Sequence, residues 1–260
     1  MKQYIVDAFT DRVFAGNQAA VCILDQWPED GLMQSIAIEN NFAETAFAVK
    51  EGEGYGLRWF TPGGEIDLCG HATLATGYVI LRFYQPEAEA VTFRTLSGPL
   101  TVARQGEGFE MDFPTYTPRP VPVTDAMAEA IGVRPLEAYL DRDLMLVLED
   151  PKTVAELTPD QERLKDLDGL LHIVTAKGTD FDCVSRVFAP KLAVAEDPVT
   201  GSAHCMLTPY WTDRLGKQSL RCFQASRRTG VLSCRMDGDR VKLAGPAALF
   251  AVSDILPEKS

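Results

Sequence analysis

The sequence contains few histidines and no closely spaced cysteine pair, and both absences narrow the chemistry open to it. Its 260 residues include three histidines and six cysteines, with no Cys-x-x-Cys and no His-Glu-x-x-His. These spacings are the usual signs of a zinc site, so we expect no bound metal. Met1–Tyr4 leads directly into a strand-like segment, so we expect no secretion signal and a cytoplasmic location. The cysteines are then expected to be reduced thiols rather than a disulfide framework.

Three further absences restrict partners and cofactors. No apolar run is long enough to cross a bilayer, so we expect no membrane contact. The chain has 25 Lys and Arg against 37 Asp and Glu, a formal charge of −12, which argues against a nucleic-acid partner. The glycine patterns that bind dinucleotides or nucleoside triphosphates are also absent, so we expect no cofactor.

The remaining composition is that of an ordinary globular protein, with 46% hydrophobic and 24% charged residues. A chain of this length can bury a substantial core in one or two domains.

A motif that occurs twice indicates a duplicated domain. Each copy has Arg-x-Phe-x-Pro, then an Asp, then Gly-x-Ala at the head of an apolar, helix-like segment. The copies consist of residues 58–62, Asp67 and Gly70–Ala72, and of residues 186–190, Asp197 and Gly201–Ala203. Two copies of a long unit predict two similar lobes rather than a solenoid.

The lobe boundaries follow from a Pro-rich stretch at residues 114–122, which is typical of a linker. We expect an N-terminal lobe over residues 1–115 and a C-terminal lobe over 116–246. The last segment, 247–260, reads as a strand that returns to the first lobe. The helix-like segment after Gly70 is apolar on nearly every face, so it should be surrounded by protein, and a curved antiparallel sheet would surround it.

The two Gly-x-Ala turns also indicate a binding site. The exposed N–H groups of a first helical turn, approached closely over a glycine, form a small anion site. Helix capping alone would explain Asp and Ser at these positions equally well. If the two lobes face each other, both helix N-termini point into one cleft that would hold a small anionic molecule.

Glu44 is the only charge in a small and apolar stretch, residues 42–49. Such a carboxylate is either exposed at a sheet edge or held in a cleft, where it is suited to general acid–base chemistry. His71 follows Gly70 at a helix start. A neutral imidazole that hydrogen-bonds substrate or moves a proton suits that position, although packing explains it as well. Asp197 is equally explained as a turn former, and Ser202 as an N-cap.

Cys69 provides an alternative base, because a helix N-terminus stabilises a thiolate. The corresponding position in the second copy is Thr200, which counts against a mechanism with two thiols.

These segments together resemble the PhzF family of phenazine-biosynthesis-like proteins, which share the diaminopimelate epimerase fold. The resemblance rests on five segments spread over most of the chain: residues 7–17, 41–47, 60–62, 67–73 and 196–204. It implies an α+β protein of two pseudo-symmetric domains, each with a central helix wrapped by a mostly antiparallel sheet. It also implies cofactor-independent chemistry in the cleft between the lobes and frequent homodimers.

The resemblance assigns roles residue by residue. Glu44 matches the acid/base glutamate, and His71 and Asp197 match its assisting pair. The substrate-binding positions are Gly70, Ala72, Thr73, Gly201, Ser202 and Ala203. The implied activity is an isomerase that moves a proton on a small carboxylate-bearing metabolite. Two alternatives stay open: a racemase, epimerase or dehydratase that uses Cys69 as a thiol base, and a non-catalytic small-molecule-binding protein of the same fold.

Overall fold

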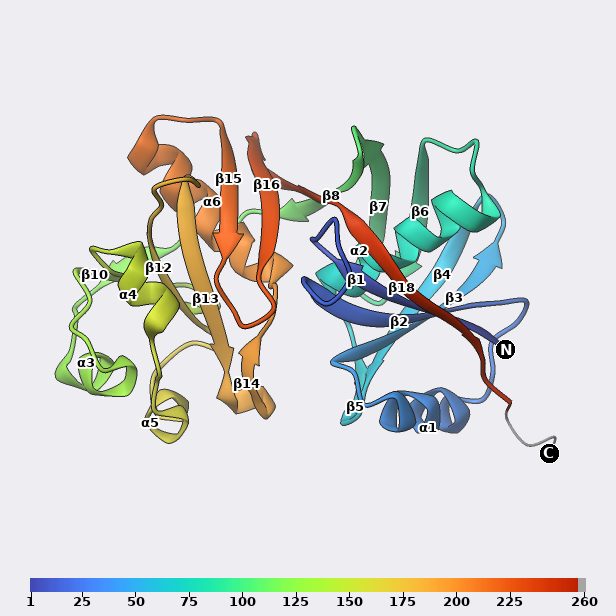
Figure 1. The fold of residues 1–260 in the computed structure, drawn as a ribbon, viewed down its shortest axis with the longest axis horizontal. Helices are drawn as coiled ribbons and strands as arrows, with labels where there is room; N and C mark the ends of the chain where they lie inside the picture. Colours follow the sequence, from blue (N-terminus) through green and yellow to red (C-terminus); the bar gives the residue numbers. More distant parts are fainter. Residues whose placement is uncertain (257–260) are drawn as a thin grey trace. The chain divides into compact units, whose positions relative to one another are not determined.

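The computed structural model describes residues 1–256 and divides the chain into two compact units (Figure 1). Unit 1 comprises Met1–Asp112 together with the segment from Ala244 onward, and unit 2 comprises Phe113–Leu243. The expected C-terminal strand is present as β18 (Ala247–Asp254), which pairs antiparallel with β1 inside unit 1. The end of that expected segment, residues 257–260, lies outside the described residues.

Unit 1 is one curved, mostly antiparallel sheet around a single helix. Its strands are hydrogen-bonded in the order β18–β1–β2–β3–β4–β6–β7–β8, with the short β5 on β4; only the pairs β2–β3 and β4–β6 are parallel. The elements are β1 (Lys2–Ala8), β2 (Asn17–Leu24), α1 (Asp30–Asn40), β3 (Glu44–Glu51), β4 (Gly54–Thr61), β5 (Gly64–Ile66), α2 (Gly70–Val79), the π-helix η1 (Ile80–Tyr84), β6 (Ala90–Thr95), β7 (Gly98–Gln105) and β8 (Gly108–Pro114).

Unit 2 repeats this plan. Its strand order is β9–β10–β11–β12–β13–β15–β16, with β14 on β13, and only β11–β12 and β13–β15 are parallel. The elements are β9 (Arg119–Val121), α3 (Asp125–Ile131), β10 (Glu137–Leu140), β11 (Leu144–Val147), α4 (Pro151–Glu156), α5 (Gln161–Lys165), β12 (His172–Lys177), β13 (Cys183–Ala189), the 3₁₀ helix η2 (Pro190–Leu192), β14 (Val194–Asp197), α6 (Gly201–Leu215), β15 (Ser219–Gln224), β16 (Gly230–Asp237) and β17 (Arg240–Gly245).

The two sheets share the same pairing sequence, which is the structural form of the duplicated motif. In unit 1 the series β1–β2–β3–β4–β6–β7 is antiparallel, parallel, antiparallel, parallel, antiparallel. The series β10–β11–β12–β13–β15–β16 in unit 2 has the same sequence. In each unit the main helix is inserted after the short strand on the fourth member of the series. The α+β class predicted from the sequence is confirmed.

The buried central helices carry polar side chains whose hydrogen bonds must be formed with other groups of the protein. Every residue of α2 from His71 to Val79 is buried. The hydroxyl groups of Thr73 and Thr76 donate to the carbonyls of Cys69 and Ala72, one turn back along the helix. In α6 the hydroxyl of Thr208 donates to the carbonyl of His204 in the same way, at 2.6 Å. These bonds remove the cost of burying a hydroxyl without a partner.

The Arg-x-Phe part of the motif forms the same clamp in both units. Arg58 of β4 holds both oxygens of Glu65 at 2.6 and 2.7 Å, and its guanidinium lies 5.1 Å from the ring centre of Phe60. Arg186 of β13 holds both oxygens of Glu196 at 2.7 and 2.9 Å, and lies 5.0 Å from the ring centre of Phe188. The paired Glu stands on the short strand that leads into the central helix. The clamp therefore fixes the direction in which the chain enters α2 and α6.

The structure departs from the sequence-based expectations at two places. The Pro-rich linker contains a strand, β9, because its residues pair with β10. The helix-like segment after Gly70 is α-helical only to Val79 and continues as a π-helix, Ile80–Tyr84. No described helix is long and apolar enough to cross a membrane.

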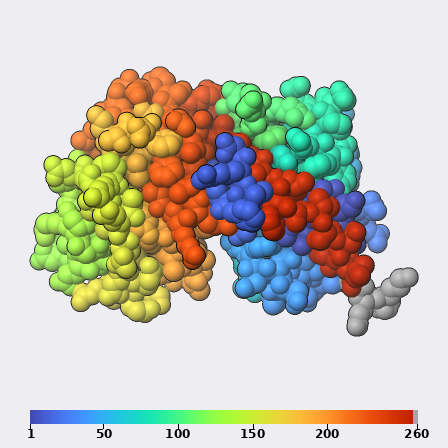
Figure 2. Space-filling view, viewed as in Figure 1, coloured from blue at the N-terminus to red at the C-terminus, as the bar shows by residue number. Residues whose placement is uncertain are grey.

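Strand β18 is partly exposed along most of its length. Its atoms, red in Figure 2, lie at the surface of the drawn face, and Phe250 and Val252 are about half exposed. The ring of Phe250 contacts that of Phe14 edge to face at 5.5 Å.

Two helical glycines in unit 1 predict opposite responses to alanine. A Cβ on Gly77 of α2 would lie 2.5 Å from Cγ1 of Val102, whereas a Cβ on the exposed Gly31 of α1 would have nothing within 4 Å. We expect Gly31→Ala to raise the free energy of unfolding by up to about 1 kcal/mol through helix propensity. We expect Gly77→Ala to lower it by about 1–3 kcal/mol, because the core is overpacked. Denaturant unfolding measures both, and a stabilised Gly77→Ala variant would contradict the packing described for α2.

His172, the first residue of β12, predicts acid sensitivity. Its side chain is fully buried, and burial together with the charge of Lys191 lowers the pKa of His172 to about 4. Between pH 6.5 and 4 the unfolded chain therefore binds a proton at this position that the folded chain does not. The resulting stability is present above pH 6.5 and is lost as the pH falls toward 4, by at most roughly 3 kcal/mol. Unfolding measured across this window should show a shallower slope in His172→Gln, and an imidazole NMR resonance of His172 titrating near pH 6.5 would refute the assignment.

Candidate active site

Glu44 and His71 lie next to each other at the N-terminal end of α2, the central helix of unit 1. Glu44 is the first residue of β3, and His71 lies in the first turn of α2. Glu44 Oε2 lies 3.0 Å from His71 Nε2, although the two groups are not aligned as a hydrogen bond. The side chains are 16% and 7% exposed. Oε2 is buried against the ring, which leaves Oε1 as the oxygen that can reach a bound molecule.

Asn17, at the start of β2, occupies the other ring nitrogen. Its side-chain amide nitrogen lies 3.2 Å from His71 Nδ1, and both residues are buried. As assigned, the amide donates to Nδ1, which places the ring proton on Nε2, toward Glu44. With the amide turned over, its oxygen would accept a hydrogen bond from Nδ1–H of a charged ring. Asn17 therefore fixes the ring plane in both charge states.

The electrostatics of His71 differ from the expected neutral imidazole. Burial alone lowers the pKa of His71, but its interactions with Cys69 and with the Glu44 carboxylate outweigh burial and raise the pKa above the ordinary 6.5. The reason is tertiary: the helix terminus disfavours a cation there, but a carboxylate 3.0 Å away favours one more strongly. His71 is thus suited to share a proton with Glu44.

Cys69 lies directly behind this pair. Its sulfur is 3.6 Å from His71 Nδ1, on the side of the ring away from Glu44 Oε2, and the residue is 6% exposed. Burial, followed by the charge of Glu44, raises the pKa of the Cys69 thiol. Both effects disfavour the thiolate form of Cys69, which weakens the case for a thiolate base.

The N-terminus of α2 has no side-chain cap. Cys69 occupies the N-cap position without accepting a hydrogen bond from the helix, so the first-turn N–H groups of Gly70–Ala72 are not capped by a side chain. Ala72 and Thr73 are buried and Gly70 is partly exposed. The Thr73 hydroxyl donates to the Cys69 carbonyl, so Thr73 supports the turn and its hydroxyl proton is already used.

Asp197 belongs to a hydrogen-bonded turn in unit 2. Its Oδ2 accepts from the Thr200 hydroxyl at 2.6 Å. The buried Gln224 joins both ends of this turn: its Oε1 accepts from Thr200 N–H at 2.8 Å, and its Nε2 donates to the Asp197 carbonyl at 2.8 Å. Ser226 donates from its hydroxyl to the Pro198 carbonyl at 2.7 Å. These bonds hold the entry to α6 in a single conformation.

The N-terminus of α6 is also free of a side-chain cap, because the Thr200 hydroxyl is bonded to Asp197 instead. Gly201 and Ala203 are buried and Ser202 is partly exposed. Both helix starts therefore present uncapped N–H groups, as an anion site requires.

The structure thus brings Glu44 and His71 together in unit 1 and holds Asp197 beside the start of α6 in unit 2. The expectation that these two groups face a common cleft concerns the relative placement of the units, and it stays a prediction.

Two residues of these sites lay outside the expected set. Asn17 is not among the predicted site residues, and the fold brings its side-chain amide to His71. Gln224 is the last residue of β15, and its contact with Thr200 joins this strand to the start of α6, 24 residues earlier in the chain. Neither contact is readable from local spacing.

Two groups among the described residues have the donor types and proximity that a metal ion needs. One is Glu44, Cys69 and His71, and the other is His204, Cys222 and Cys234; within each group the ligand atoms lie within 4.8 Å of one another. In the first group both ring nitrogens of His71 already face chain partners.

Comparison with known proteins supports the fold and the family. The phenazine biosynthesis-like protein family matches residues 6–252. An uncharacterized isomerase of Pseudomonas aeruginosa is 49% identical over 245 residues, 94% of this chain and 95% of its own. The crystal structure of a PhzF-family phenazine biosynthesis protein from Enterococcus faecalis superposes with a TM-score of 0.97 at 50% identity, covering 98% of this chain and 99% of the other.

A more distant structure extends the likeness of fold. A hydroxyproline epimerase from Agrobacterium vitis, solved with bound trans-4-hydroxy-L-proline, superposes with a TM-score of 0.62 at 9% identity, covering 97% of this chain and 91% of the other. At that identity the likeness concerns the fold alone, and it confirms the predicted diaminopimelate epimerase-like architecture. The duplicated sheets, the two uncapped helix starts and the close match over nearly the whole chain lead to one conclusion: the chain belongs to the phenazine biosynthesis-like, or PhzF, family.

Proposed function

We propose that this protein is an isomerase that moves a proton on a small, carboxylate-bearing metabolite, with Glu44 as the general acid and base. The observation that carries the proposal is the contact of Glu44 with His71, at 3.0 Å. The name of the Pseudomonas aeruginosa relative supports the reaction class.

The geometry supports a division of labour within this pair. Glu44 removes a proton from a substrate carbon through Oε1, the oxygen turned away from His71. The imidazole, whose ring orientation is fixed by Asn17, stabilises the carboxylate while Glu44 is charged. It shares the proton with Glu44 after the carboxylate has removed that proton from the substrate. The proton then returns to a different carbon of the same molecule, so that no group outside the chain and its substrate is consumed.

The uncapped helix starts supply the binding energy for the substrate. First-turn N–H groups at Gly70–Ala72 and at Gly201–Ala203 are donors suited to a carboxylate, and the Ser202 hydroxyl adds a further donor at α6. Fixed donors also stabilise the negative charge that develops when a carbon loses its proton. Asp197 keeps the α6 donors in place through Thr200.

The first prediction concerns Glu44→Gln. The amide cannot take a proton from carbon, so incorporation of deuterium from heavy water into the substrate should fall by about 10²–10⁴-fold. The measurement is mass spectrometry of a metabolite mixture incubated with the protein in heavy water. Glu51→Gln is the matched control, because Glu51 lies at the far end of the same strand and contacts Trp27 and Arg94. Exchange in Glu44→Gln at the level of Glu51→Gln would exclude Glu44 as the base.

The alternative reaction, racemisation or epimerisation with Cys69 as a thiol base, is tested by Cys69→Ser. If Glu44 is the base, exchange should stay within about tenfold of the unmodified chain, because Cys69→Ser changes only the contact of this side chain with the imidazole. A loss as large as that of Glu44→Gln would transfer the role to Cys69. Ligands that raise the melting temperature without any exchange in the unmodified chain would instead support a non-catalytic binding protein.

A further inference from the structure

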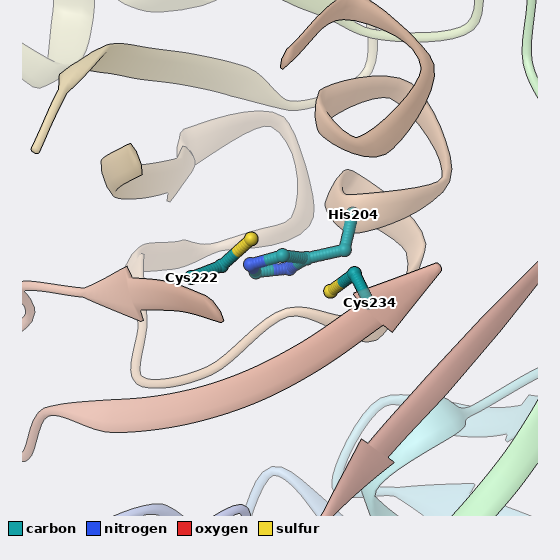
Figure 3. Close-up of side chains that lie close together, drawn as sticks. All are labelled: His204, Cys222 and Cys234. Carbon is teal, nitrogen blue, oxygen red and sulfur yellow. The ribbon is translucent and has the colours of Figure 1, made fainter. Parts of the chain in front are cut away.

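Three side chains that are far apart in the sequence converge in the core of unit 2. His204 extends from α6, Cys222 from β15 and Cys234 from β16, and the His204 ring lies between the two sulfur atoms (Figure 3). One ring nitrogen and the two sulfurs all lie within 4.8 Å of one another. All three side chains are at most 1% exposed.

One ring nitrogen of His204 is held by the backbone and the other has no partner among the described residues. Its Nδ1 lies 2.8 Å from the Thr200 carbonyl, an acceptor, so Nδ1 carries the proton and the lone pair is on Nε2. A backbone carbonyl behind the ring is the usual support of a metal-binding histidine. Nε2 is buried and has no hydrogen-bond partner among the described residues, which is an unfavourable state for an imidazole nitrogen.

We propose that His204, Cys222 and Cys234 form a structural binding site for a thiophilic divalent cation, with Zn²⁺ as the fitting ion. The donor set is one imidazole nitrogen and two sulfurs, which Zn²⁺ prefers over oxygen-binding cations. Binding releases one proton from each thiol, and the two thiolates balance the double positive charge. The complex is neutral, as a site formed by three side chains at most 1% exposed requires.

Cys183 of β13 is register-paired with Cys222 on the neighbouring strand, but its sulfur does not belong to the group of donor atoms that lie within 4.8 Å of one another. The proposed protein ligands are therefore His204, Cys222 and Cys234, whose two thiolates keep the complex neutral. The cation would tie β15 and β16 to α6 close to the turn that holds Asp197.

The site is separate from the proposed reaction, because its ligands lie in unit 2 behind the start of α6 while Glu44 and His71 lie in unit 1. The test must exclude metal binding by the other donor group, which consists of Glu44, Cys69 and His71. The experiment therefore uses the full chain with Cys69→Ala, reduced, refolded in Co²⁺ as the probe and then titrated with Zn²⁺.

We expect one equivalent of Co²⁺ per chain, with the intense near-ultraviolet absorption of a thiolate–cobalt bond, and complete displacement by Zn²⁺. Zn²⁺ should also raise the melting temperature of this chain. Adding Cys222→Ser, Cys234→Ser or His204→Gln should weaken binding at least tenfold. Cys22→Ser is the matched control, because Cys22 is an equally buried thiol of unit 1 that donates to Gln3, and it should leave the absorption unchanged.

Absence of the thiolate–cobalt absorption in the refolded Cys69→Ala chain would overturn the proposal, and this result needs no further variant to fold. Absorption that persists unchanged in both Cys222→Ser and Cys234→Ser would also overturn it. Where these variants do not fold, X-ray absorption of the Zn²⁺-loaded Cys69→Ala chain decides. Two or three sulfur neighbours with one nitrogen support the site, and a shell of oxygen neighbours refutes it.

Discussion

The arrangement of both units depends on a helix that is enclosed by protein. Once α2 is surrounded by its sheet, each polar group on it must find a partner inside the fold. Thr73 and Thr76 solve this locally by bonding to carbonyls one turn back. His71 has no such local solution, and its partners come from other strands: Asn17 from β2 and Glu44 from β3. The same constraint that stabilises the fold thereby assembles the acid–base pair.

The same constraint acts in unit 2 with a different outcome. At the fourth residue of each helix, Thr73 and His204 both bond to the carbonyl of the N-cap residue. The hydroxyl proton of the threonine is used by this bond, whereas the histidine retains a second, buried ring nitrogen without a hydrogen-bond partner among the described residues, and its ring lies beside Cys222 and Cys234. Duplication therefore preserved the backbone role of this position, while the residue placed there gave unit 2 a donor set that unit 1 lacks at the corresponding place.

The duplicated Arg–Glu clamps explain why the two helix starts are alike. Each guanidinium is held by a carboxylate on the short strand before the helix and lies close to a phenylalanine ring. Two parallel hydrogen bonds between planar groups define an angle as well as a distance, so the chain enters both helices in the same way. The anchored turn of Asp197 and Gln224 adds rigidity at α6, where binding of a small anion would otherwise have to order the loop.

Much of this architecture could be predicted from the sequence, because it depends on patterns among residues that are close together in the chain. Apolar periodicity and turn residues are short-range properties, and they located the central helices, the returning C-terminal strand and the repeated motif. The solitary charge of Glu44 and the Gly70–His71 helix start were visible for the same reason. The partners of these residues were not: Asn17 on His71, Gln224 on Thr200, and His204 between two cysteines are contacts between strands and helices far apart in the chain. Their geometry arises only when the sheet closes around its helix, and the same closure, by placing a carboxylate beside a buried ring, raises the pKa of His71 where the helix terminus alone would lower it.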